Sequence, residues 1–457
     1  TLNSNNNQGS TIQMNGGSYG GSDYFFVYTG LKVASAGNVE LVYAQYGDSL
    51  LTLNNVTLND KSHLFAGGYG YGAGGAEANV QIIGNTSIEM TGCTINGSVS
   101  IYGGGRTGGL GVSFISGNTS ISISGITVSA GSTLNIYGSG YNDSPQGLNS
   151  INGIATIKVS GTNDIAGKLN IYGGGINIGS GTSSSVIGGS THIQIGTAGM
   201  TDRISLNNVY GGGIGNVYVN GNTTITFAGR GQITMSGTLS GDGVTAGNVG
   251  GSKSLNFDRF SGTLGAIAVK NFDVVNLDTN SSVVFTNRLD LDTVNAFNFT
   301  IDEERTLPDT AILDFAGGIT KWSAGLTISV VVGDGGMFDG TTLTLVSALD
   351  SLDSWAGKAI KLTTKSGLSD NNWDALIGED IFDVNSGNTY RFDLVDFDNN
   401  GHMDGLQMTM TGANDSALPS ALSDMVNSLA LDNLSLGSEA DLGSAMNWNK
   451  QNNGMLA

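Results

Sequence analysis

Charged residues, cysteine, proline and histidine are all scarce in this chain. Charged residues make up 12% of its 457 residues, about half the usual share of a soluble domain. The single cysteine, Cys93, excludes a disulfide framework and a cluster of cysteine metal ligands, and we expect it to be a small buried side chain. There are 3 histidines, and we find no catalytic triad, phosphate-binding loop or common metal-ligand spacing.

Long apolar runs are missing as well, and the net charge is strongly negative. No apolar run reaches the roughly 18 residues of a membrane-spanning helix, so the sequence predicts no transmembrane segment. The formal net charge of −20 argues against nucleic acid as a partner. The sequence starts at Thr1 without an initiator methionine or a signal peptide, which predicts a processed, exported chain.

Glycine is abundant instead, and it opens a phrase that repeats. The phrase Gly-Asn-Thr-Ser-Ile at 84–88 returns unchanged at 117–121, and related phrases stand at 153–157, 189–193 and 221–225. The five opening glycines are 33, 36, 36 and 32 residues apart. A period of this length is typical of solenoids and other repeat architectures.

A second phrase follows the first at the same period. Ile-Tyr-Gly-Gly-Gly at 101–105 recurs in closely related form at 136–140, 171–175 and 209–213. Two phrases that keep one period are stronger evidence of a repeat than either phrase alone.

The repeat unit has the two-residue periodicity of a β-strand. Ile88 and Met90 flank Glu89, and Ile121 and Ile123 alternate with serines, so one apolar face points inward. Glycine, asparagine and serine separate the strands because they tolerate tight corners. A unit of about 35 residues cannot bury its apolar face alone, but it can do so by stacking on a copy of itself.

This pattern predicts an all-β fold, a right-handed parallel β-helix (β-solenoid) with a C-terminal β-rich cap and a short helical tail. Each repeat is expected to form one coil or two smaller ones, because the period alone does not decide between them.

The tyrosine of the second phrase recurs at one place in successive repeats. Stacked copies would form an aromatic ladder, in which each ring pair adds roughly 0.5–1.5 kcal/mol beyond burial. The glycines after each tyrosine are predicted to lead the chain out of the coil as loops, which would lie together on one face. Two interpretations stay open, a structural ladder or an exposed platform on which a sugar stacks. The ladder residues are Tyr102, Tyr137, Tyr172 and Tyr210.

Charge divides the chain into a neutral and an acidic part. Residues 61–250 carry six acids and six bases, whereas residues 251–457 carry 28 acids and 11 bases. We therefore expect two regions with different roles, a neutral shaft and an acidic C-terminal half.

Read in order, the chain divides into five segments. They are an N-terminal start of the solenoid (1–60), a regular shaft (61–250), a loop-poor continuation (251–305), an acidic C-terminal β region or cap (306–412) and a tail with a short helix (413–457).

One segment, residues 396–404, has the spacing of oxygen ligands found in calcium loops. Its acidic and amide side chains alternate around a glycine, as calcium loops require. Gln407 replaces the bidentate glutamate of an EF-hand, and no entering helix is predicted. A plain hairpin turn is the alternative, and calcium is the one cofactor that the sequence suggests. The tentative ligands are Asp396, Asp398, Asn400 and Asp404.

Catalytic groups are hard to find. Parallel β-helices also serve as polysaccharide lyases and hydrolases, which need convergent carboxylates. Asp290 and Asp292 share one face of a predicted strand, which a solvated surface also explains, and His192 fills a serine or threonine position of the repeat, where we expect exposure. The sequence favours a non-enzymatic protein, with a carbohydrate-active enzyme as the alternative.

The two phrases together resemble the passenger regions of bacterial autotransporter-type surface proteins and related glycine-rich repeat adhesins. The resemblance covers about residues 60–250 well and the rest loosely, and residues 325–410 look like the closing segment of such passengers. Its motifs are specific to architecture and not to activity. It implies export across a Gram-negative outer membrane and a secreted or cell-surface location.

The function expected from these observations is structural or adhesive. An open end of a solenoid must be capped, or its edge strands pair with another molecule. We expect an extracellular β-solenoid that assembles with itself into fibres or a surface layer, with host or cell-surface glycans or proteins as further partners. A calcium-dependent adhesion module is a third hypothesis.

Overall fold

The computed structural model describes most of the chain up to residue 411. The described ranges are 9–35, 41–73, 77–179, 184–307, 310–333, 341–350, 352–366, 369–383 and 388–411. The helix predicted within 413–457 lies outside these residues. No helix in the described ranges has the length and apolar character needed to cross a membrane.

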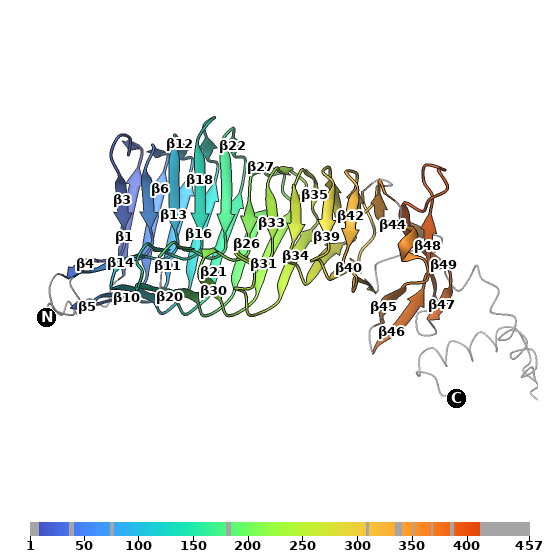
Figure 1. Ribbon diagram of the computed structural model, residues 1–457. Helices are drawn as coiled ribbons and strands as arrows, with labels where there is room; N and C mark the ends of the chain where they lie inside the picture. Colours follow the sequence, from blue (N-terminus) through green and yellow to red (C-terminus); the bar gives the residue numbers. More distant parts are fainter. Residues whose placement is uncertain are drawn as a thin grey trace, which may run out of the picture.

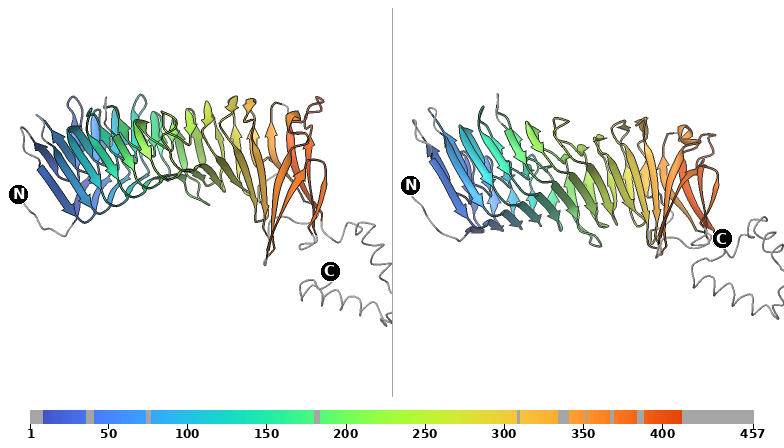
Figure 2. Two further views of the ribbon diagram at one scale, coloured as in Figure 1. Left: turned by 60° about the horizontal axis from the view of Figure 1, so that its bottom comes forward. Right: turned by 90° about the horizontal axis from the view of Figure 1, so that it is seen from below.

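Parallel strands stack along one axis into a solenoid (Figures 1 and 2). Strand β11 (Thr86–Thr91) pairs in parallel with β16 (Thr119–Ser124), and Thr86 lies opposite Thr119. The offset of 33 residues equals the spacing of the repeated phrase. The predicted all-β parallel solenoid is thereby confirmed, and each repeat forms one coil.

Three sheets form the walls of the N-terminal coils, which we call sheets A, B and C. Sheet A comprises β1 (Ser10–Asn15), β6 (Ser49–Asn54), β11, β16, β21 (Ala155–Ser160), β26 (Thr191–Gly196), β31 (Thr223–Ala228), β34 (Lys253–Asp258), β37 (Val274–Asp278), β40 (Ala296–Ile301), β43 (Thr327–Val332), β45 (Ala359–Ser366) and β46 (Ser369–Leu376). Sheet B comprises β2 (Ser18–Tyr19), β7 (Thr57–Leu58), β12 (Thr94–Ile95), β17 (Thr127–Val128) and β22 (Asp164–Ile165). Sheet C comprises β3 (Phe25–Tyr28), β8 (Ser62–Phe65), β13 (Ser98–Tyr102), β18 (Thr133–Tyr137), β23 (Lys168–Tyr172), β28 (Val209–Tyr210), β33 (Thr238–Ser240) and β36 (Ala268–Lys270).

Two further sheets, D and E, form a wing along the N-terminal half (Figure 1). Sheet D comprises β4 (Lys32–Ser35), β9 (Tyr69–Gly72), β14 (Arg106–Gly109), β19 (Tyr141–Asn142), β24 (Ile176–Asn177) and β29 (Ile214–Gly215). Sheet E comprises β5 (Leu41–Tyr46), β10 (Ala78–Ile83), β15 (Gly111–Ile115), β20 (Leu148–Ile151), β25 (Ser184–Ile187) and β30 (Val217–Val219). The segments after the tyrosine phrase, which we expected to be loops, therefore contain short strands, because each pairs with its copies in the neighbouring coils.

The coil becomes smaller in the C-terminal half. Sheets B, D and E end at β22, β29 and β30, and sheet F begins at β27. Ser254 in β34 lies opposite Val274 in β37, only 20 residues later. Sheet F comprises β27 (Arg203–Leu206), β32 (Gln232–Met235), β35 (Ser261–Leu264), β38 (Ser282–Phe285), β41 (Leu313–Phe315), β44 (Thr341–Ala348), β49 (Gly405–Thr411), β48 (Asn388–Val395) and β47 (Asp380–Asp383), and β39 (Leu289–Leu291) pairs with β42 (Ile319–Trp322).

Parallel stacking ends in antiparallel hairpins. Strand β45 pairs antiparallel with β46, and β49 pairs antiparallel with both β44 and β48. The only helical element among the described residues is the 3₁₀ turn Asp353–Trp355, which buries the Trp355 side chain completely. The turn at residues 396–404, singled out in the sequence, connects β48 to β49.

One hydrophobic core runs through the solenoid. The inward residues of sheet A repeat one apolar side chain per coil, and each is at most 1% exposed. They are Leu51, Ile88, Ile121, Ile157, Ile193 and Ile225. Burying each such side chain stabilises the fold by about 1.5–3 kcal/mol, which explains why the alternation in the sequence is strict. Cys93 is buried in the same core.

Candidate functional site

A hydrogen bond links the two repeated phrases within a coil. The threonine of the first phrase donates its hydroxyl to the carbonyl oxygen of the first glycine after the ladder position. The bonds at 2.5–2.6 Å are Thr86 to Gly103, Thr119 to Gly138, Thr191 to Gly211 and Thr223 to Gly241. These bonds fix the ends of the sheet C strands relative to sheet A.

The four tyrosines predicted to form a ladder lie in one file. The ring centroids of Tyr102 and Tyr137 are 4.9 Å apart, those of Tyr137 and Tyr172 are 4.9 Å apart, and those of Tyr172 and Tyr210 are 5.4 Å apart. Tyr102, Tyr137 and Tyr172 are 1%, 4% and 8% exposed. The faces of these three rings stack on the neighbouring tyrosine rings and are therefore covered. This part of the ladder is a structural element and not an exposed platform for sugars.

Sheet D covers the ladder. Each coil places a sheet D residue four positions after its ladder ring, and these residues stand opposite one another in register. Tyr141, Ile176 and Ile214 pack directly against the ladder. The full file is Lys32, Tyr69, Arg106, Tyr141, Ile176 and Ile214. The wing and the outer face of sheet C therefore meet at a concave corner.

At the N-terminal coils this corner opens into a cavity of about 440 Å³, which we call the aromatic cleft. Ligand sites in proteins commonly have volumes of about 300–1,000 Å³. The lining residues come from four successive coils. They are Tyr24, Phe26, His63, Phe65, Arg106 and Tyr141.

Arg106 is the central polar group of the aromatic cleft. Its guanidinium carbon lies 5.2 Å from the ring centroids of Phe26 and Tyr69 and 5.5 Å from that of Tyr141. Its Nη2 donates to Asp143 Oδ2 at 2.8 Å. Burial alone would lower the pKa of Arg106, but the hydrogen bond to Asp143 raises it above its ordinary value, so the group stays charged.

The outer rings of the aromatic cleft are accessible. Tyr24 is 65% exposed and Phe26 is 38% exposed. The Phe26 and His63 rings lie 5.2 Å apart at an interplanar angle of 20°, and Tyr24 and Phe26 lie 5.7 Å apart at 11°. Burial, helped by the nearby Arg106 charge, lowers the pKa of His63, so its imidazole is neutral at pH 7.

Sequence reasoning missed the aromatic cleft. The aromatic run from Tyr24 to Tyr28 lies outside both repeated phrases, and Arg106 lies in a segment that we expected to be a loop. The available signal was the four-residue interval from Tyr102 to Arg106, which repeats from Tyr137 to Tyr141. That interval identifies facing files only after the coils are known to stack.

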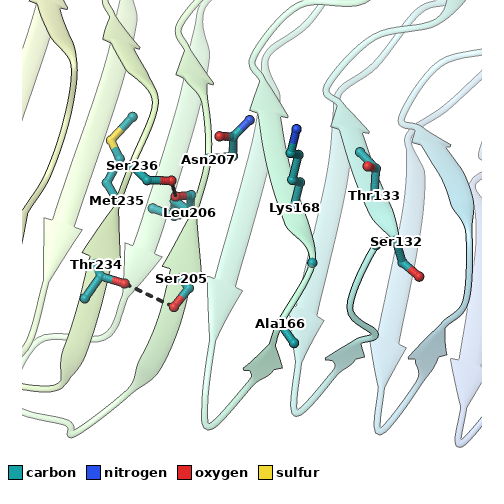
Figure 3. A pocket seen from close by; sticks show the side chains of 12 residues that line it. Ser132, Thr133, Ala166, Lys168, Ser205, Leu206, Asn207, Thr234, Met235 and Ser236 are labelled. Carbon is teal, nitrogen blue, oxygen red and sulfur yellow. Dashed lines mark hydrogen bonds between the residues drawn. The ribbon is translucent and has the colours of Figure 1, made fainter.

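A second, larger groove lies where the coil changes size (Figure 3). It has a volume of about 690 Å³ and spans neighbouring strands from Thr133 through Lys168 to Met235. Its walls are mainly serine, threonine, asparagine and glycine, and Lys168 is its only charged lining residue. Ser205 in β27 and Thr234 in the neighbouring β32 share a hydrogen bond of 3.0 Å. A groove with one ionisable group offers little for acid–base chemistry.

The tentative calcium loop joins β48 to β49. Asp396, Asp398 and Asp404 each offer a carboxylate oxygen within 4.8 Å of the others, which is the only such group of three among the described residues. Asn400, the fourth tentative ligand, instead donates its Nδ2 to Asp398 Oδ2 at 2.9 Å and accepts at Oδ1 from the backbone N–H of His402 at 2.8 Å.

The loop also satisfies its carboxylates with its own backbone. Asp396 Oδ2 accepts from the N–H of Gly401 at 2.8 Å, which lowers the pKa of Asp396. Asp404 Oδ1 accepts from the N–H of Phe397 at 2.8 Å. The donor set has the oxygens that Ca²⁺ prefers, but a hairpin turn uses the same atoms without an ion.

The other ionisable groups considered in the sequence do not converge. Asp292 is paired with Lys321 Nζ at 3.1 Å, and Asp290 Oδ1 accepts from the N–H of Asp292 at 3.1 Å. His192 is exposed on sheet A, and His402 Nδ1 lies 2.9 Å from Asp353 Oδ2. These groups lie on different elements from the aromatic cleft.

No protein-family model, curated protein or solved structure matches this chain.

Proposed function

We propose that this protein is an extracellular structural or adhesive β-solenoid that presents the aromatic cleft to a partner and associates with copies of itself. The observation that carries the proposal is the aromatic cleft itself. It gathers accessible rings around Arg106, which pairs with Asp143, near the N-terminal end of the solenoid. Aromatic and arginine side chains dominate the energetics of contact surfaces.

The surface of the shaft supports a role in display. The outward positions of β16 are Ser120, Ser122 and Ser124, and inward positions alternate with them. Residues 61–250 carry equal numbers of acids and bases. A neutral, hydroxyl-rich shaft does not attract charged molecules over long distances, so contacts concentrate where larger side chains gather.

The first strand of sheet A supports self-association. Strand β1 pairs on one side with β6 and ends the order of described strands in sheet A. Ile12 and Met14 pack against the core but remain only partly buried. A strand edge flanked by half-buried apolar residues is a template for pairing with another chain.

The location follows the resemblance to autotransporter-type passengers and glycine-rich repeat adhesins. A passenger of that kind works outside the cell, as a secreted or surface-bound protein. The neutral shaft agrees with such a role.

The proposal is tested by two measurements on the purified chain. Light scattering with negative-stain microscopy should show filaments or oligomers, and fluorescently labelled protein should bind bacterial or host cell surfaces saturably. Dispersed monomers together with no cell-surface binding would contradict the proposal.

A carbohydrate-active enzyme is the second candidate. His63, with its lowered pKa, lines the aromatic cleft, and Asp143 pairs with Arg106 of the same cleft, so a base and a carboxylate accompany a cation. Release of reducing ends or of unsaturated products from acidic and neutral polysaccharides, abolished by His63→Ala, would favour the enzyme over the adhesive protein.

A further inference from the structure

The aromatic cleft has the features of a saccharide site. We propose that it binds an uncharged pyranose, with the sugar C–H groups on the rings of Tyr24 and Phe26 and its hydroxyl groups on Arg106 and Asp143. The ligand class deepens the proposed adhesive function, and it rests on the cleft being a contact surface.

Ring geometry is the first support. Tyr24, Phe26 and His63 are nearly parallel, with interplanar angles of 11° for Tyr24 with Phe26 and 20° for Phe26 with His63. Tyr24 and Phe26 are also among the exposed large hydrophobic residues of the chain. A group of accessible parallel rings suits a ligand that has flat apolar faces and a polar circumference, as a pyranose has.

Polar chemistry is the second support. Arg106 has donors only, and Asp143, when ionised, has acceptors only, so the pair places both types side by side. The vicinal hydroxyl groups of a sugar both donate and accept, and they match such a pair. Arg106 lines the aromatic cleft, and Asp143 stands beside the cleft through its ion pair with Arg106; the two side chains are 22% and 28% exposed.

The charges around the aromatic cleft bear on the choice between a neutral and an acidic sugar. The charge of Arg106 is already compensated by Asp143 at 2.8 Å, so a carboxylate on the ligand would meet the Asp143 carboxylate. Two lysines also lie near the aromatic cleft: Lys61 Nζ is 5.5 Å from the Tyr24 ring centroid, and Lys32 Nζ is 5.6 Å from that of Tyr69. Lys61 Nζ also donates a hydrogen bond to the carbonyl oxygen of Ser22, which fixes the position of the ammonium group and leaves its charge in place. An acidic sugar is therefore the necessary comparison in the test.

The contrast with the rest of the ladder explains why the site lies at this end. Beyond Tyr141, which lines the aromatic cleft, the sheet D file continues as Ile176 and Ile214, which pack against the ladder and close the corner. Arg106 extends instead toward Phe26, across the intervening coil. The corner remains open around the coil in which Arg106, and not an apolar residue, occupies the sheet D position.

The experiment is saturation-transfer difference NMR on the full chain with maltose, cellobiose, lactose and D-galacturonate. We expect saturable transfer to the ring C–H protons of at least one neutral disaccharide. Tyr24→Ala and Phe26→Ala should each weaken its Kd by about two- to tenfold, because each removes one stacking surface. Tyr218→Ala is the matched control, because Tyr218 is 44% exposed in β30, away from the aromatic cleft, and it should leave the Kd unchanged.

Tyr24 is 65% exposed, so its alanine variant should fold even if Phe26→Ala does not. Transfer to none of the neutral disaccharides, transfer to D-galacturonate alone, or an equal loss in Tyr218→Ala would overturn the inference. Unchanged cell binding by Tyr24→Ala, together with no transfer to any neutral disaccharide, would overturn the inference and leave adhesion through another surface. Disaccharide binding without cell binding would contradict the adhesive function and keep the saccharide site.

Discussion

Thr119 Oγ1 donates a hydrogen bond to the carbonyl oxygen of Gly138 at 2.6 Å. The two residues belong to different repeated phrases, and both are buried. Their bond connects sheet A to the end of the ladder strand in sheet C. Ala155 occupies the position of Thr119 in the next coil and has no hydroxyl, so the solenoid tolerates one coil without this bond.

Replacing Thr119 by valine should destabilise the fold by about 1 kcal/mol. Valine keeps the shape of threonine but leaves the buried Gly138 carbonyl without this donor. Thermal unfolding followed by circular dichroism measures the loss. Ser120→Ala is the control, since Ser120 is the next residue and is exposed on the outer face. Equal melting temperatures for Thr119→Val and Ser120→Ala would show that the bond contributes nothing.

Gly138→Ala should destabilise the fold by about 1–3 kcal/mol or prevent folding. A Cβ at Gly138 would lie 2.2 Å from the carbonyl oxygen of Gly173 in the next coil, so the coils would have to separate. Gly325→Ala is the matched control, because nothing lies within 4 Å of a Cβ there. Chemical unfolding of both variants compares them, and a Gly138→Ala protein as stable as Gly325→Ala would contradict the close stacking of these loops.

The ladder should make the protein sensitive to alkaline pH. Burial, with the neighbouring Tyr210, raises the pKa of Tyr172 to about 12, whereas a tyrosine in the unfolded chain titrates near 10. The folded state holds the proton more tightly, so this stability is complete below about pH 10 and is lost as the pH rises toward 12.

Melting temperatures between pH 8 and 12 measure this effect. We expect a steep fall above pH 10 that becomes shallower in Tyr172→Phe, which keeps the stacked ring without the hydroxyl. Tyr218→Phe, at an exposed ring, should follow the unaltered chain. An identical pH profile for Tyr172→Phe and the unaltered chain would rule out this titration as the cause.

The turn between β48 and β49 should form without calcium. Asp396 and Asp404 already accept backbone hydrogen bonds from Gly401 and Phe397. We expect the melting temperature to stay the same when excess EDTA is added. A clear fall with EDTA, reversed by Ca²⁺ and absent in Asp398→Ala, would establish a structural calcium site instead.

The architecture could be predicted because two recurring phrases show the repeat in the sequence itself. Ile88 and Ile121 alternate with polar residues and stand at equal places in their phrases, and the structure pairs them in register. The period alone left one or two coils per repeat open. The pairing of Tyr102 with Tyr137, 35 residues apart, resolves this in favour of one coil.

The aromatic cleft could not be predicted in the same way. Phe26, His63 and Arg106 are separated by 37 and 43 residues in the sequence, and none belongs to a conventional motif. They meet because Phe26 pairs with His63 across strands and because the Arg106 side chain reaches back over the intervening coil. The direction of these side chains depends on how sheets D and E of the wing meet sheet C. The segments that form the wing were expected to be loops, so the sequence offered no basis for placing these side chains.

The central claim is that one repeat makes one coil, because only this stacking brings Phe26, His63 and Arg106 into one cleft. Double electron–electron resonance between spin labels at Ser87→Cys and Thr224→Cys tests it most directly. These positions lie on sheet A and are linked in register through the outward positions of three intervening coils. The four steps predict Cα atoms about 19 Å apart, whereas two coils per repeat would place them about 38 Å apart and contradict the account.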